Sequence, residues 1–320
     1  MSSHIDMGQI EADRGIRAVK ISLVGLLVTF FLQIVVAWIG GSAALVADAL
    51  HNLADAFASV PLWAAFLLSK RGATRRFPYG YTKAEDLAGV VIVLVILGSA
   101  FLAAYESLRK WLHQAAPTHL GLGMAAALIG LIGNELVAIY KIREGKAIGS
   151  AALVADGLHS QVDGLTSLAA FLGLLGVSLG FPWADPAMGL LISFAIFYLV
   201  WEAGRDVVLH LMDAIEPGVL ERIERTAEGV EGVRGAHQIR ARWSGRHVYV
   251  CLCIQVDPAL TVVEGHRIAE EVRHVLLHRI PQLADVDVHV DPAWEGSDPY
   301  HTLTRHHFEG GVTGPLQTGD

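Results

Sequence analysis

The pattern of hydrophobic and polar positions divides the chain into two regions. Long apolar runs follow one another from residue 16 to about residue 205, and charged residues return at ordinary spacing after residue 213. A helix needs about 20 predominantly apolar residues to cross the hydrocarbon core of a membrane. Runs of this kind cover residues 19–39, 44–68, 87–108, 120–140, 151–179 and 186–203. The pattern therefore predicts six transmembrane helices.

The second region has the shorter periods of a small soluble domain. Helical spacing covers 217–228 and 261–279, and strand-like alternation covers 237–243, 247–257 and 286–291. Pro217 opens the first helix, Ser244–Gly245 provides a turn, and Thr261 with Glu264 forms a capping box. The order αββαβ predicts a small α+β domain of the ferredoxin-like type.

Composition agrees with a membrane class, since 53% of the residues are hydrophobic and the mean hydropathy is +0.45. We therefore predict an α-helical membrane protein with six helices, followed by the small α+β domain. We expect an N-terminal segment at 1–15 and the helical transport domain at 16–212. The soluble domain is expected at 213–294 and a disordered tail at 295–320. Cys251 and Cys253 lie two apart in a predicted strand, which argues against a disulfide framework.

The basic residues predict the orientation. Cytoplasmic loops are enriched in lysine and arginine, and here these residues concentrate in alternate loops. One side has Arg14, Arg17, Lys20, Lys70, Arg71, Arg75, Arg76, Lys83, Lys141, Arg143 and Lys146, whereas the other has Arg109 and Lys110. Both termini are expected in the cytoplasm.

An internal repeat links the second and fifth predicted helices. Residues 41–48 read Gly-Ser-Ala-Ala-Leu-Val-Ala-Asp, and residues 149–156 repeat this segment without change. Three predicted spans separate the copies, so the two helices run in opposite directions. Inverted repeats of this kind bring related segments together near the membrane midplane in transporters.

Each copy continues into a His-x-x-x-Asp pair, His51 with Asp55 and His159 with Asp163. A spacing of four places both side chains on one face of a helix. A carboxylate inside a bilayer is costly unless it is paired or solvated, so two such pairs need an explanation. Two imidazoles and two carboxylates form a set that suits Zn²⁺, and Co²⁺, Fe²⁺, Ni²⁺ or Cd²⁺ less well. A local structural contact is the alternative for a single pair, but the duplication favours a shared ion site.

Asp48 and Asp156 precede the two histidines by three residues. Four roles remain open for them: direct ligands of the ion, acceptors for the N–H of a ligating histidine, charges on the access route, or helix-start residues after the Gly-Ser pair.

These motifs resemble those of the cation diffusion facilitator family over nearly the whole chain, from the first span to Pro292. The resemblance rests on the two repeated segments, on Tyr-Gly-Tyr-Thr-Lys-Ala-Glu at 79–85, and on Leu-Met-Asp at 211–213. In the soluble region it rests on Gly-Ala-His at 235–237 and Val-His-Val-Asp-Pro at 288–292.

The resemblance implies a homodimer that exports a cytoplasmic divalent metal ion in exchange for protons. It implies transport ligands at His51, Asp55, His159 and Asp163, in the zinc-preferring pattern, and a structural charge pair between Lys83 and Asp213. Regulatory metal ligands are implied in the soluble domain at His237, Cys253, His266, His289 and Asp291. The chain departs from some relatives at 71–81, where the loop is basic and lacks histidine, so we expect no metal there.

Several alternatives stay open. Cys253 could be a zinc ligand, or Cys251 and Cys253 could point into the core of the soluble domain. The tail histidines His301, His306 and His307 could capture metal, although a disordered polar tail is the simpler interpretation.

Other functional classes are a membrane metalloprotease, a metal sensor that does not transport, and a channel. No His-Glu-x-x-His motif occurs, so no enzymatic activity is expected. The predicted partners are the metal ion, protons, the bilayer and a second copy of the chain, with no organic cofactor and no nucleic acid. The expected location is the inner membrane of a bacterium.

Overall fold

The computed structural model describes residues 2–40, 46, 49–50, 52–53, 57–113, 120–280, 283–294, 300–303 and 306. Contacts divide the chain into two units, Met1–Met212 and Asp213–Asp320, and each is described by itself.

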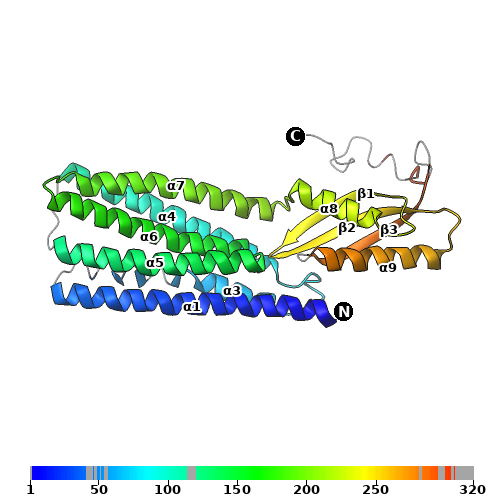
Figure 1. Ribbon diagram of the computed structural model, residues 1–320, viewed down its shortest axis with the longest axis horizontal. Coiled ribbons are helices and arrows are strands. Elements are labelled where there is room, and N and C mark those ends of the chain that lie inside the picture. Colours follow the sequence, from blue (N-terminus) through cyan, green and yellow to red (C-terminus); the bar gives the residue numbers. More distant parts are fainter. Residues whose placement is uncertain are drawn as a thin grey trace. The chain divides into compact units, whose positions relative to one another are not determined.

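The first unit is a bundle of helices (Figure 1). Its described helices are α1 (Ser2–Gly40), α3 (Val60–Ser69), α4 (Lys83–His113), α5 (Leu120–Ile148), α6 (Ala151–Ser178) and α7 (Ala184–Leu211). The helix α5 packs against α1 and α6, and α7 packs against α4 and α6. The short helix α3 contacts α1 and α4.

Among the described residues, five helices are long and apolar enough to cross a membrane, and α3 is a shorter apolar helix. Large apolar and aromatic side chains cover the outside of the bundle; Trp38, Phe194 and Trp201 are 84%, 74% and 73% exposed. Such a surface needs a hydrocarbon surrounding. The predicted helical membrane fold is confirmed. The second predicted span includes residues outside the described part, so the number six stays a prediction.

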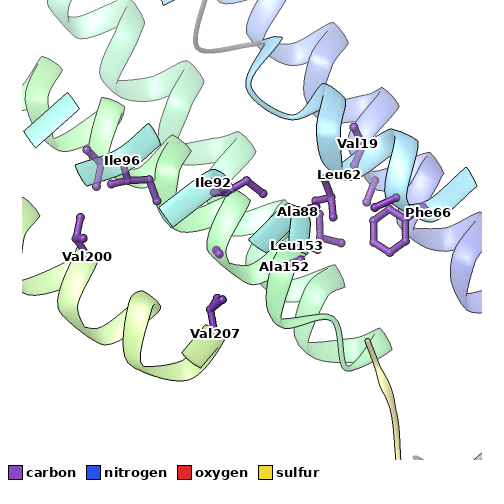
Figure 2. Packing of buried hydrophobic residues seen from close by; sticks show 14 of the residues in the cluster. Val19, Leu62, Phe66, Ala88, Ile92, Ile96, Ala152, Leu153, Val200 and Val207 are labelled. Carbon is purple, nitrogen blue, oxygen red and sulfur yellow. The ribbon is translucent and has the colours of Figure 1, made fainter. Parts of the chain in front are cut away.

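The bundle interior is an apolar cluster that joins all of these helices. Phe66 and Leu62 of α3 are fully buried beside Val19 of α1, and Ile92 and Ile96 of α4 continue the cluster along the bundle (Figure 2). Side chains at three- and four-residue spacing thus form the buried stripe of each helix.

The helix α5 differs from the sequence prediction. Lys141, Arg143 and Lys146 were assigned to a loop after residue 140, but all three lie within α5, which ends at Ile148. Lysine, arginine and glutamate are good helix formers, so the helix continues beyond its apolar part.

The second unit has the predicted order αββαβ: α8 (Pro217–Glu228), β1 (Gly235–Ser244), β2 (His247–Val256), α9 (Val262–Arg279) and β3 (Leu283–Pro292). The sheet order is β1-β2-β3, with β1 antiparallel and β3 parallel to β2. The side chain of Thr261 accepts from Glu264 N–H while Glu264 accepts from Thr261 N–H, which confirms the capping box.

The two faces of the sheet differ. Alternate residues of β2, from Val248 to Val256, are buried in a core shared with α8 and α9. Cys251 and Cys253 occupy the intervening positions, and Cys251 is exposed. The alternative that these cysteines point into the core is wrong, because strand alternation places them on the open face.

Candidate metal sites

The helix α6 holds the second predicted pair of transport ligands. Ser150 caps its N-terminus by accepting from Leu153 N–H at 3.3 Å, and Gly149 before it has a φ of +68°. The side chain of His159 is buried, and Asp163 is partly buried one turn further on. His159 therefore lies in the interior of the apolar bundle, and Asp163 lies one turn further along the same helix.

The first pair, His51 and Asp55, lies outside the described residues, as does Asp48. The convergence of the two pairs therefore stays a prediction. The neighbouring Asn52 is described, and it donates to Gln33 of α1 at 2.9 Å.

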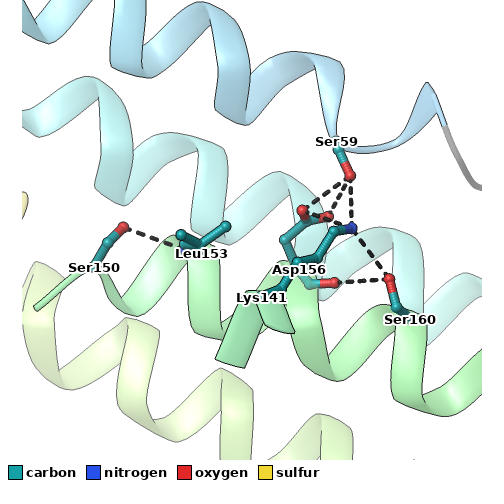
Figure 3. A network of polar contacts seen from close by, with 6 residues as sticks. All are labelled: Ser59, Lys141, Ser150, Leu153, Asp156 and Ser160. Carbon is teal, nitrogen blue, oxygen red and sulfur yellow. Dashed lines mark hydrogen bonds and ion pairs between the residues drawn. The ribbon is translucent and has the colours of Figure 1, made fainter. Parts of the chain in front are cut away.

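A buried ionic network surrounds the Asp156 carboxylate (Figure 3). The Lys141 ammonium of α5 is 2.9 Å from Oδ2 of Asp156 on α6 and donates to the hydroxyls of Ser59 and Ser160, at 3.0 and 3.1 Å. Ser59 in turn donates to the Asp156 carboxylate. Lys141 and Asp156 are 1% and 0% exposed.

Every N–H donor of the Lys141 ammonium has a hydrogen-bond acceptor in this network. An ammonium has three donors, and here each has one oxygen acceptor. The carboxylate of Asp156 is neutralised by Lys141 rather than directed to solvent. Any part that Asp156 has in metal handling therefore involves Lys141, which the sequence interpretation had counted as a loop charge.

Glu135 is a further acidic residue that the sequence interpretation missed. It lies in the apolar part of α5, and its Oε2 is 3.5 Å from where a Cβ on Gly164, the neighbour of Asp163, would lie. This oxygen is buried and has no hydrogen-bond partner among the described residues. An acid within a transmembrane span is itself a signal of function, and that signal could have identified Glu135.

The soluble unit brings four predicted ligands together on the open face of its sheet. The register places His237 opposite Cys253, and Cys253 opposite His289, in one row across β1, β2 and β3. Asp291 follows two residues after His289 on the same face. The row is next to a bulge in β1, where Gln238 has a φ of +50°. Bulges of this kind often reorient side chains at sites.

Two groups of ligand atoms arise there, and Asp291 belongs to both. One is His237, Cys253 and Asp291; the other is His289, Asp291 and His301. Within each group the candidate atoms lie within 4.8 Å of one another. Imidazole, thiolate and carboxylate are zinc ligands.

The surroundings favour the neutral form of Cys253. Its pKa is raised by burial and then by the Asp291 carboxylate, while Arg240 acts in the opposite direction. A thiol of this kind ligates only after losing its proton, so a metal at the first group would have to displace that proton.

The remaining predicted residues lie elsewhere. His266 is exposed on α9 and belongs to neither group of ligand atoms within the described chain. Lys83 lies 3.9 Å from Asp86 within α4, whereas Asp213 belongs to the second unit with a φ of +57°. The Lys83–Asp213 pair stays a prediction.

Comparison with known proteins agrees with this architecture. The family model for the cation efflux transmembrane domain matches residues 19–212, and that for the cytoplasmic domain of cation efflux proteins matches 215–293. A probable cation efflux system protein of Mycobacterium tuberculosis is 46% identical over 88% of this chain and 85% of its own length. A manganese efflux system protein of Bacillus subtilis is 27% identical, over 86% of this chain and 96% of its own.

A solved structure, the cadmium form of a variant of the MamM C-terminal domain, is 33% identical over 24% of this chain and 98% of that chain, with a TM-score of 0.24. The apolar bundle, the two family-model matches and the efflux relatives define an integral membrane cation transporter rather than an enzyme. The chain belongs to the cation diffusion facilitator family of cation efflux proteins.

Proposed function

We propose that the protein exports a divalent transition metal from the cytoplasm, zinc first, in exchange for protons. The ion is held by His51, Asp55, His159 and Asp163. The observation that carries this proposal is the repeat, because the same imidazole and carboxylate recur in two predicted spans of opposite direction. The burial of His159 supports it, because an imidazole and a carboxylate one turn apart on a bundle helix are both zinc ligand types.

The ligands also provide the coupling. An imidazole must be neutral and a carboxylate ionised to hold metal, so protons and metal compete for one site. Towards the cytoplasm, near neutral pH, the site loads metal; towards a more acidic exterior, protonation releases it. Alternation between the two faces then exchanges metal for protons.

The working protein is a homodimer in the inner membrane of a bacterium, with both termini in the cytoplasm. The groups around Asp291 bind regulatory metal, which stabilises one arrangement of the dimer and biases the transport equilibrium. The basic residues on one side of the predicted spans support this orientation.

The test is metal uptake into proteoliposomes by the Asp163→Ala variant. We expect it to abolish uptake while the protein remains folded, and Asp285→Ala, which changes an acid of the soluble unit, serves as the matched control with normal uptake. Full transport by Asp163→Ala would refute the assignment. A protein that binds metal but gives no flux in its native form would be a sensor, and current without proton flow would indicate a channel.

The metal is tested separately, because the manganese exporter of Bacillus subtilis shows that relatives differ in cargo. We expect the native chain to favour zinc among zinc, cobalt, iron, nickel, cadmium and manganese. The His51→Asp variant replaces a nitrogen ligand by oxygen and should shift the preference towards manganese. Unchanged preference would show that the histidine does not select the metal.

A further inference from the structure

The C-terminal segment contributes a histidine to the open face of the sheet. His301, which follows β3 by nine residues in the sequence, has its Nε2 3.5 Å from Oδ1 of Asp291. The same oxygen is 3.1 Å from Nε2 of His289. Three side chains from β3 and the following segment thus converge on one point.

The spacing of these atoms is that of metal ligands. Ligand atoms about 2.0–2.1 Å from a tetrahedral zinc ion lie about 3.3 Å from one another. The two distances to Asp291, 3.1 and 3.5 Å, bracket this value. Two imidazoles and a carboxylate also form one of the ligand sets that zinc proteins use with a fourth position for water.

The Asp291 carboxylate is nearly buried and is surrounded by imidazoles. Its side chain is 4% exposed, and its Oδ2, 3.4 Å from His237, has no hydrogen-bond partner among the described residues. A buried carboxylate is costly unless it is paired or bound to metal. His289 and His301 are 64% and 40% exposed, so metal can reach the site from solvent.

Aromatic contacts with Trp294 position His301. The Trp294 ring contacts the rings of His237, Tyr300 and His301, with centroids 5.5, 6.3 and 6.2 Å apart. Ala293 N–H continues the strand ladder by donating to Val256 at 2.7 Å. Tyr300 and His301 therefore lie against Trp294, at the end of β3, and His301 lies beside Asp291.

We propose that His301 is a ligand of a zinc-class ion held with His289 and Asp291, so that metal binding fastens the C-terminal segment onto the soluble domain. This deepens the regulatory site proposed above. The competing interpretation is an ion pair between a protonated His301 and Asp291, which needs no metal.

The test uses the full chain in detergent, in an Asp163→Ala background that weakens zinc binding at the transport site. Zinc binding is measured by competition with a chromophoric chelator. We expect His301→Ala to lower the zinc affinity of one site at least about tenfold, because removing even an outer-shell partner of a ligand has an effect of about that size. His306→Ala, at an exposed histidine outside both groups, is the matched control and should bind as the parent does.

The segment itself is followed by cleavage after Arg305 with an arginine-specific protease, which does not cut at the lysine of His301→Lys. Zinc should slow this cleavage in the parent and in His306→Ala, but not in His301→Ala. His301→Lys separates the two interpretations, because lysine keeps the positive charge and cannot ligate as imidazole does. His301→Cys should restore zinc-dependent protection, because a thiolate is a zinc ligand.

Each outcome decides the matter. Equal zinc binding and protection in His301→Ala would overturn the proposal, and protection in His301→Lys without zinc would establish the ion pair instead. Loss of binding in Asp291→Ala, with none in His301→Ala, would leave the regulatory site in place and remove only the role of His301. Neither result bears on the transport ligands.

Discussion

Lys141 shows how one residue changes meaning once its surroundings are known. By itself a lysine after an apolar run indicates the end of a membrane span. Here an acid and two hydroxyls from other segments surround its ammonium group. Because every N–H donor has an acceptor, these contacts offset the desolvation cost of burying the charge. Ser59 lies 82 residues from Lys141 in the sequence, and Asp156 lies on the next helix. No local sequence pattern could therefore reveal the network.

Removing only the lysine should therefore be damaging. We expect Lys141→Met to destabilise the first unit by about 3–5 kcal/mol, because Asp156 remains as an uncompensated buried charge. Lys141→Met combined with Asp156→Asn should recover most of this loss. Lys146→Met, at an exposed lysine of the same helix, is the control.

The measurement is the midpoint of thermal unfolding in detergent. Equal midpoints for Lys141→Met and Lys146→Met would contradict the structural role of the pair.

His247 provides a pH prediction in the second unit. Burial, together with the nearby Arg246 charge, lowers the pKa of His247 to about 4. The unfolded chain has the ordinary value near 6.5, so it binds the proton first as the pH falls. The free energy of unfolding should consequently decrease between pH 6.5 and pH 4, by about 3 kcal/mol from this group.

Urea unfolding of residues 213–306 at pH 7 and pH 4.5, with chelator present, measures this effect. His247→Gln removes the titrating group and should reduce the difference between these two pH values by about 2.5 kcal/mol, the part of the effect that falls within this range. An identical pH dependence in the variant would show that other groups are responsible.

At the scale of elements, the pairing of α5 with α6 depends on small residues. A Cβ on Gly157 would lie 2.6 Å from Cγ1 and 2.9 Å from the backbone nitrogen of Ile142. Backbone cannot give way as a flexible side chain does. The repeated Gly-Ser pair also has a local role, because Gly149 makes the turn and Ser150 caps α6. Part of the repeat therefore specifies helix geometry rather than ligands.

Gly157→Ala should separate the two helices and lower thermal stability, although alanine is the better helix former by up to about 1 kcal/mol. Gly98→Ala, at a helical glycine of α4 with nothing within 4 Å, should be neutral or stabilising. Unfolding midpoints of the two variants in detergent give the comparison. A stabilised Gly157→Ala protein would show that the hairpin adapts at little cost.

At the scale of the whole molecule, the proposed exchange of metal for protons makes a prediction about direction. In proteoliposomes with the cytoplasmic face outward, zinc added outside should enter and make the lumen more alkaline as protons leave. An acidic lumen should accelerate uptake, because protonation releases zinc there. A lumenal pH dye follows the protons, and the Asp163→Ala variant gives the background. Uptake without any pH change would exclude proton coupling.

Sequence patterns predicted much of this architecture for physical reasons that act locally. Membrane thickness fixes the length of apolar runs, which predicted the helical bundle. Strand and helix periods, with the capping box at Thr261, predicted the αββαβ unit. Alternation by itself left the direction of Cys253 open, because either face of a strand can be the buried one.

The sequence by itself determined the membrane class, the soluble domain and the duplicated His-x-x-x-Asp pairs, since all three depend on residues close together in the chain. Only the tertiary structure decided that Lys141 is buried against Asp156, that Cys253 faces away from the core, and that His301 lies against Asp291. Those outcomes depend on which helices and strands become neighbours. The packing of the entire unit decides which segments become neighbours. A buried charge or a ligand group is stable only when such distant segments supply its partners.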